Sequence, residues 1–86
     1  MKDRIRNLRE SLKLDRTMFA TETGIKAKTW ANVESGTQKA NEEHIKAIIN
    51  KWPEYAYWLT TGQTIPEAGQ ISPEIEETRK NLSTGA

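Results

Sequence analysis

The sequence predicts an all-α protein, and three observations carry that prediction. Apolar residues recur at three- and four-residue steps in most segments, as they do on one face of an amphipathic helix. Residues that favour helix N-termini, such as Asp15 and Asn41, precede these segments, and glycines that favour helix C-termini, such as Gly24 and Gly36, follow them. No segment shows a convincing β-strand pattern.

Two helices are predicted before the first glycine. Residues 2–13 place apolar side chains on one stripe with charged residues between them, and that stripe consists of Ile5, Leu8 and Leu12. Leu14 is expected in the core after this helix. Asp15 is a good N-cap for a second helix, because its carboxylate accepts a hydrogen bond from the first turn. The second helix would present Met18 and Phe19 to the core.

Three further short helices are predicted up to residue 62. The third spans residues 27–35 and directs Trp30 and Val33 inward. Asn41 caps a fourth helix, with an apolar stripe of Ile45, Ile48, Ile49 and Trp52. A proline suits the first position of a helix, so the fifth is expected over residues 53–59.

The sequence divides into a domain over residues 1–62 and a C-terminal tail over residues 63–86. Residues 63–70 contain one proline, one glycine and a single large apolar residue, and they are expected to form a linker. Ser72 and Pro73 favour the start of a short helix over residues 74–82, which has few apolar residues to bury. Disorder is expected for residues 83–86.

Composition excludes several classes of protein. The 86 residues include no cysteine, which excludes disulfides and thiolate metal sites and favours a reducing, cytoplasmic location. No apolar run approaches the roughly 20 residues that a membrane span requires. His44 is the single histidine and has no metal-ligand spacing around it. Without a phosphate loop or a nucleophile motif, we expect no enzyme activity, no metal and no cofactor.

The net charge of +1 conceals an asymmetry along the chain. Residues 1–40 hold nine basic and five acidic residues, whereas residues 41–86 hold four basic and seven acidic ones. Such a division is typical of a small domain that presents one face to a polyanion. Chance accounts for it equally well, so the charge alone decides nothing.

The second and third helices have the spacing of a helix-turn-helix motif. A small residue, Ala20, lies four positions before Gly24, and Ile25 fills the inside of the turn. If the third helix enters the major groove of DNA, its outward positions are Ala27, Lys28, Ala31 and Asn32. Lys28 can then donate to guanine and Asn32 can pair with adenine. Without the helix-turn-helix motif, both would simply be solvated polar residues on an exposed helix face.

The run from Leu14 to Gly36 resembles the phage lambda-repressor-like, or Cro/Xre-type, helix-turn-helix family. The resemblance covers residues 3 to about 60 and rests on Ala20, Gly24, Ile25, Thr29 and the run Val33-Glu34-Ser35-Gly36, where that family commonly has Ile-Glu-Asn-Gly. It implies a compact five-helix fold that binds DNA, with base contacts from Ala27, Lys28 and Asn32. The phosphate contacts it implies come from Arg16, Thr17, Lys26, Thr29, Thr37 and Lys39.

Several residues depart from the pattern of that family. Thr23 replaces a usual leucine before the turn, where it either loosens the corner or forms a local hydrogen bond. Arg16 occupies a position where the family often has glutamine, and Lys26 occupies the position of the usual Ser or Thr N-cap of the third helix. Trp30 is larger than the aliphatic residue that is usual at its position. Glu34 is expected to cap or pair structurally. The basic residues expected on a solvated face of the first helix are Arg4, Arg6 and Arg9.

These features predict a sequence-specific regulator of transcription that binds double-stranded DNA, a repressor of a phage, prophage or bacterium. One recognition helix reads few base pairs, so a homodimer on a palindromic operator is expected. The expected dimer surface is Tyr55, Tyr57 and Trp58, with the helix over residues 73–82 as a second candidate. Core positions are the stronger interpretation for Trp30, Trp52, Tyr55 and Trp58.

Two alternatives use the same fold. A helix-turn-helix antitoxin would bind a protein partner through residues 63–86. An interaction module would have kept the fold and lost DNA binding, and the two alanines on the outward face of the third helix favour it.

Overall fold

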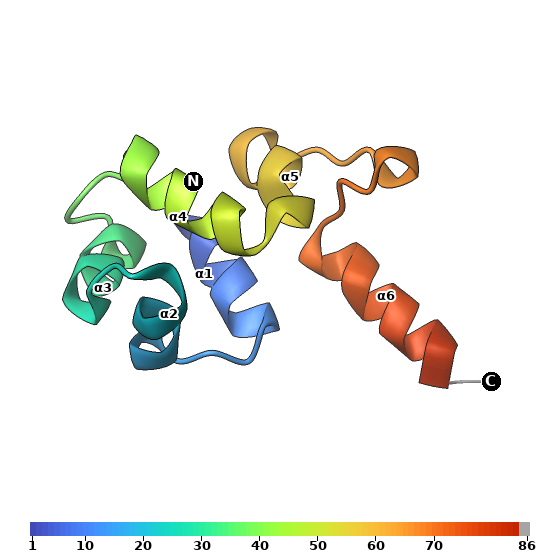
Figure 1. The fold of residues 1–86 in the computed structure, drawn as a ribbon, viewed down its shortest axis with the longest axis horizontal. Coiled ribbons are helices and arrows are strands. Elements are labelled where there is room, and N and C mark those ends of the chain that lie inside the picture. Colours follow the sequence, from blue (N-terminus) through green and yellow to red (C-terminus); the bar gives the residue numbers. More distant parts are fainter. Residues whose placement is uncertain (85–86) are drawn as a thin grey trace.

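The computed structural model describes residues 1–84 and shows an all-α protein within that range (Figure 1). Its α-helices are α1 (Lys2–Ser11), α2 (Arg16–Thr23), α3 (Ala27–Ser35), α4 (Glu42–Lys51), α5 (Ala56–Thr61) and α6 (Pro73–Thr84). Two short 3-10 helices, η1 (Pro53–Tyr55) and η2 (Pro66–Ala68), precede α5 and follow it. The described residues form no strand, only one isolated bridge between Ile65 and Gln70.

The predicted helix ends are confirmed around α2, α3 and α4. The Asp15 carboxylate accepts a hydrogen bond from the Met18 N–H at 2.8 Å. Asn41 and His44 form a reciprocal cap, in which Asn41 Oδ1 accepts from the His44 N–H at 3.0 Å and His44 Nδ1 accepts from the Asn41 N–H at 3.1 Å. Gly24 follows α2 in the left-handed conformation, with φ of 75°. Local capping chemistry therefore sets these boundaries.

The first helix ends two residues earlier than predicted. Lys13 adopts a left-handed conformation, with φ of 61°. The Leu14 N–H reaches back to the Arg9 carbonyl at 3.2 Å and the Lys13 N–H to the Glu10 carbonyl at 3.0 Å. This is the hydrogen-bond pattern of a Schellman motif, which usually requires a glycine. Because a lysine occupies that position, the sequence pattern did not mark the helix end.

The core is built from buried residues of α1 to α5 and of η1, together with Ile71 of the C-terminal segment. Phe19 lies at its centre, with its ring 4.8 Å from that of Trp30 and stacked on Trp52 at 5.5 Å. The buried hydrophobic residues are Ile5, Leu8, Phe19, Trp30, Val33, Ile48, Tyr55, Trp58, Leu59 and Ile71. The prediction that Met18 faces the core is wrong, because its side chain is 48% exposed.

Residues 63–72 form an ordered loop where a linker was predicted. The Gln70 side chain fastens this loop to the start of α5, accepting from the Tyr57 N–H at 2.9 Å and donating to the Pro53 carbonyl at 3.1 Å. The Ile71 N–H donates to the Glu54 carbonyl at 2.9 Å, and the Ile71 side chain is buried in the core. The segment that follows α5 is thus part of the packed structure.

The last helix, α6, projects from the body of the molecule and carries the C-terminal end away from it (Figure 1). Ser72 Oγ caps it by accepting from the Ile75 N–H at 3.2 Å. Asn7 of α1 donates to the Glu74 carboxylate at 3.3 Å, whereas Leu82 is 72% exposed. The backbone of residues 83–84, for which disorder was predicted, is helical, and residues 85–86 lie outside the described range. No helix in the described part is long and apolar enough to cross a membrane.

Candidate nucleic-acid interface

Helices α2 and α3 meet through a turn of three residues, Gly24 to Lys26 (Figure 1). An added Cβ at Gly24 would meet no atom within 4 Å, so the positive φ alone requires glycine there. Ile25 is half-buried against the core, as its predicted place inside the turn requires. On α3, Trp30 and Val33 are fully buried. One face of α3 is therefore held by the core, and the opposite face points outward.

Thr23 forms the local hydrogen bonds that were one of its two predicted roles. Its hydroxyl donates to the Phe19 carbonyl at 2.7 Å and accepts from the Trp30 indole N–H at 2.9 Å. The Ile25 N–H approaches the same oxygen at 3.4 Å. One hydroxyl thus ties α2, the turn and α3 together, and the corner is fastened rather than loose. A leucine at this position would leave the buried indole N–H without an acceptor.

A buried ion-pair cluster joins α1, α2 and α3. The Glu34 carboxylate accepts from Arg9 Nε at 2.8 Å and from Arg9 Nη2 at 3.0 Å. Arg16 Nη2 lies 3.3 Å from the same carboxylate. The hydrogen bonds from Arg9 to Glu34 raise the pKa of the Arg9 guanidinium above its ordinary value. The predicted structural pairing of Glu34 is confirmed.

The prediction that Arg4, Arg6 and Arg9 lie on a solvated face of α1 is wrong for two of these three arginines. Arg9 is buried in the cluster with Glu34. Arg4 is half-buried and donates to the Leu59 carbonyl at 2.9 Å. Only Arg6 is largely solvated, in an exposed pair with Glu10 at 3.4 Å. The signal for Arg9 was present in the sequence, because Arg9 lies four residues after Ile5 and one after Leu8, on the edge of the apolar stripe.

The outward face of α3 carries the predicted base-contacting residues. Lys28 is exposed, and Ala27, Ala31 and Asn32 are half-buried. Lys28 and Asn32 are four residues apart, which places them on neighbouring turns of one face. Within residues 1–84, neither side chain has a hydrogen-bond or ion-pair partner. Their donors and acceptors are available to a ligand.

The predicted phosphate-contacting residues surround this face, but their states differ. Arg16 is committed in part to Glu34, with its side chain 45% exposed. Thr29 is half-buried, and the Thr37 hydroxyl lies 2.9 Å from that of Ser35. Lys26 occupies the N-cap of α3 and makes no capping hydrogen bond with its side chain. The exposed members of the set are Arg16, Thr17, Lys26, Thr37 and Lys39.

The predicted dimer residues do not form an exposed aromatic patch. Tyr55 and Trp58 are 4% and 7% exposed, respectively, and belong to the core of this chain. Tyr57 is half-buried, and its hydroxyl lies 3.4 Å from Gln63 Oε1. The sequence favoured core positions for Tyr55 and Trp58, and the structure confirms this.

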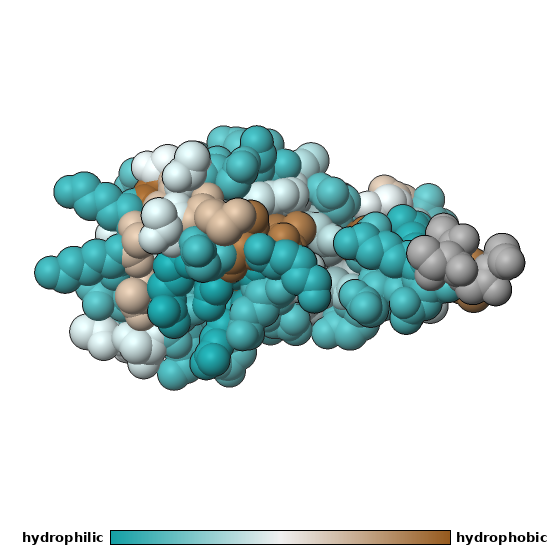
Figure 2. Space-filling model, turned by 90° about the horizontal axis from the view of Figure 1, so that it is seen from below, coloured by the Kyte–Doolittle hydropathy of each residue, from teal (hydrophilic) through white to brown (hydrophobic). Residues whose placement is uncertain are grey.

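A space-filling view shows apolar side chains gathered on the half of the molecule that holds α1 to α4, and mainly hydrophilic ones towards α6 (Figure 2).

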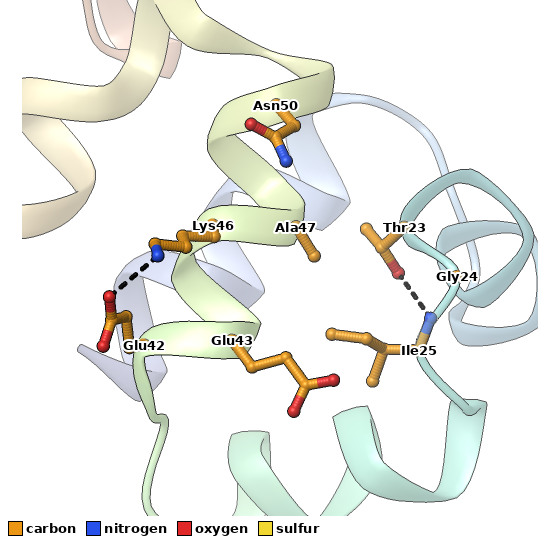
Figure 3. Close-up of a pocket in the computed structure, with 8 residues that line it drawn as sticks. All are labelled: Thr23, Gly24, Ile25, Glu42, Glu43, Lys46, Ala47 and Asn50. Atoms are coloured by element: carbon orange, nitrogen blue, oxygen red, sulfur yellow. Dashed lines mark hydrogen bonds and ion pairs between the residues drawn. The ribbon is translucent and has the colours of Figure 1, made fainter.

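An open groove of about 540 Å³ lies between the turn and α4 (Figure 3). Ile25 points across it, and on its α4 side the Glu42 carboxylate pairs with Lys46 Nζ at 2.9 Å. Glu43 also lines it. Two carboxylates make this groove unfavourable for a phosphate. Across the described chain, no group of three His, Cys, Asp or Glu side chains is placed to hold a metal ion.

No protein-family model matches the chain, and no curated protein matches it. The features that bear on function are therefore those of α2, α3 and the residues around them. The structure also shows three features that the sequence did not predict: the buried position of Arg9, the bond between Thr23 and Trp30, and the fastening of the C-terminal segment by Gln70.

Proposed function

We propose that this protein is a sequence-specific regulator of transcription that binds double-stranded DNA through α3. The single observation that carries the proposal is the two-sided character of α3. Trp30 and Val33 are fully buried, while Lys28 and Asn32 lie on the outward face with no partner in residues 1–84. A three-residue turn containing a left-handed glycine connects this helix to α2, as a helix-turn-helix requires. The lambda-repressor-like arrangement of α1 to α5 is part of the proposal.

The proposed base contacts follow from the chemistry of the outward face. Lys28 donates to O6 and N7 of guanine, and the Asn32 amide pairs with N6 and N7 of adenine. Ala27 leaves room for close approach or contacts a thymine methyl group. Phosphates fix the register of α3 through Lys26 and Lys39, together with the other exposed residues of the predicted phosphate set. Arg16 contributes less than a free arginine would, because Glu34 shares its charge.

The proposed regulator acts as a repressor that binds a palindromic operator as a homodimer. A single recognition helix of nine residues contacts too few base pairs to specify one site in a genome. Two such helices, one from each subunit of a dimer, double the number of base pairs that are read. The burial of Tyr55 and Trp58 moves the proposed dimer surface from α5 to α6, where Leu82 is 72% exposed.

The decisive experiment is selection of bound duplexes from a random DNA library at about 150 mM salt, where purely electrostatic binding is weakened. Enrichment of an inverted repeat supports a dimeric regulator, and a single half-site supports a monomeric one. Absence of any enriched sequence would contradict the proposal. It would leave an interaction module, the alternative favoured by the alanines at positions 27 and 31.

A pair of matched variants then tests the site. Lys28→Ala and Asn32→Ala should each weaken specific binding at least tenfold, since a good base contact contributes about 1–3 kcal/mol of discrimination. Lys46→Ala and Asn50→Ala remove the same residue types at the same spacing from the exposed surface of α4 and should leave binding unchanged. Equal losses in both pairs would refute the assignment of α3 as the recognition helix.

A second candidate function is capture of a protein partner, as in a helix-turn-helix antitoxin, and the exposure of Leu82 favours it. Deleting residues 63–86 is not a clean test, because Gln70 and Ile71 belong to the packed structure. Leu82→Glu is cleaner. Loss of a co-purified partner with unchanged DNA binding supports this function, whereas loss of dimers indicates that α6 joins two copies.

A further inference from the structure

A hollow of about 420 Å³ lies at the C-terminal end of α3, on the opposite end of the helix from the turn. It is bounded by the first turn of α1, the end of α3 and the loop that leads to α4. Lys2 lines it from α1, Lys39 lines it from the loop, and Gly36 and Gln38 lie between them. Two cations from distant parts of the chain therefore border one space.

The charge of this hollow distinguishes it from the others described. No carboxylate belongs to its lining among the described residues. The groove beside the turn holds Glu42 and Glu43, a hollow at the start of α3 holds Glu43, and one between α1 and α6 holds Glu74 and Glu77. Neither Lys2 nor Lys39 has an ion-pair partner within residues 1–84. The hollow thus combines two uncompensated positive charges.

The Lys2 side chain lies against the end of α3. A Cβ built on Gly36 would lie 3.0 Å from Lys2 Nζ and 3.5 Å from Lys2 Cδ, so the lysine side chain lies directly over the glycine backbone. Gly36 itself has φ of 85°, where glycine is strongly favoured. The ammonium of an α1 residue therefore lies beside the C-terminal end of α3, at a place that the helix-turn-helix pattern does not mark.

We propose that Lys2 and Lys39 together seat one backbone phosphate of the DNA, beyond the C-terminal end of α3. This inference rests on the proposed function and adds a phosphate contact from α1 to it. A phosphate in the hollow would neutralise both ammonium groups, with none of the carboxylate repulsion that the other hollows impose. The alternative role for Lys2 is structural, since a cation near the C-terminus of a helix stabilises the helix dipole.

The salt dependence of DNA binding separates these roles. The slope of log K against log salt changes by about 0.9 for each phosphate contact on duplex DNA. The variant Lys2→Gln with Lys39→Gln should therefore reduce the slope by about 0.9 relative to the unmodified protein, by the same relation. The matched control is Lys46→Gln with Lys51→Gln, which also removes two positive charges. Both lysines lie on α4, where Lys46 pairs with Glu42 and Lys51 pairs with Glu22 of α2, so their loss should not change the slope.

Each outcome of this experiment decides the proposal. A reduction of about 0.9 in this double variant, with a smaller reduction in Lys39→Gln alone, supports one shared phosphate. If Lys39→Gln alone gives the whole reduction, Lys2 takes no part and the shared seat is overturned. A reduction of about 1.8 would show that the lysines bind separate phosphates and would overturn the shared seat. An unchanged slope with lower thermal stability would assign Lys2 to the α3 dipole and also overturn it. If the unmodified protein shows no DNA binding, the proposed function fails as well, whereas normal binding with an unchanged slope refutes this inference alone.

Discussion

Replacing Glu34 by glutamine should remove a large part of the stability of this domain. Glutamine keeps the size of the side chain but replaces one carboxylate oxygen by an amide group that cannot accept from Arg9. The Arg9 side chain is 10% exposed and Glu34 is 2% exposed, so the guanidinium left behind has little access to water. The two bonds, at 2.8 and 3.0 Å, end on different oxygens of the carboxylate, so glutamine can accept only one of them and supplies no negative charge to the guanidinium.

The expected loss is about 3–5 kcal/mol, the usual cost of removing one partner of a buried ion pair. A domain of 86 residues has a free energy of unfolding of about 4–13 kcal/mol. The substitution therefore removes about a quarter of that stability or more. It should lower the unfolding temperature by at least about 10 °C. Arg16 loses the same partner, but its contact with Glu34 is longer, at 3.3 Å, and its side chain is 45% exposed, so water compensates much of that loss.

Urea unfolding followed by tryptophan fluorescence measures the effect, because Trp30 and Trp58 report on the core. Glu10→Gln is the matched control: the pair of Arg6 and Glu10 is about 60% exposed, and its loss should cost less than about 0.5 kcal/mol. A double variant, Arg9→Met with Glu34→Leu, should recover most of the loss, because it leaves no buried unpaired charge. A Glu34→Gln variant within about 1 kcal/mol of the unmodified protein would refute this reasoning.

Three further predictions concern other contacts. Thr23→Val should lower the free energy of unfolding in urea by about 1–3 kcal/mol, because the Trp30 indole N–H loses its acceptor. The loss should be smaller when Trp30→Phe is already present, and equal losses in the two backgrounds would contradict this. Hydrogen bonds to its own backbone N–H and to Asn7 and Ser72 lower the pKa of Glu74 below 4.5, so its stabilising contribution should vanish as pH falls through that lowered value. The stability difference between unmodified protein and Glu74→Gln should disappear in strong acid, and a constant difference would exclude the linkage. Burial raises the pKa of Tyr55 above 10.0, so unfolding free energy should fall as pH rises beyond 10.0, and this part of the alkaline loss should be absent in Tyr55→Phe.

The helices of this protein follow largely from local chemistry, which explains why the sequence predicts most of them. Asp15 and Asn41 satisfy N–H groups three residues away, and Gly24 ends α2 in the left-handed conformation with its N–H bonded to the Ala20 carbonyl. Where a boundary departs from such chemistry, prediction fails. Lys13 adopts the conformation expected of a glycine, and nothing near it in the sequence marks that conformation.

Contacts between distant segments were beyond local reasoning. Arg9 and Glu34 are 25 residues apart, and the Gln70 side chain binds a carbonyl 17 residues before it. Residues 63–70 look like a linker because their composition is polar, yet a single glutamine in that segment satisfies both a donor and an acceptor at the start of α5. A polar segment is therefore ordered when its few side chains complete the hydrogen bonding of a helix end.

Thr23 and Trp30 show how two departures from a family pattern explain each other. Taken singly, a threonine before the turn removes apolar surface from the core, and a tryptophan at position 30 introduces an N–H that must be satisfied when buried. Together they form one bond of 2.9 Å between α2 and α3. The threonine hydroxyl also donates to the Phe19 carbonyl, so it has both a donor and an acceptor role and leaves no buried polar atom unsatisfied. The inner face of α3 is thus joined to α2 by a polar contact as well as by the packing of Trp30 and Val33.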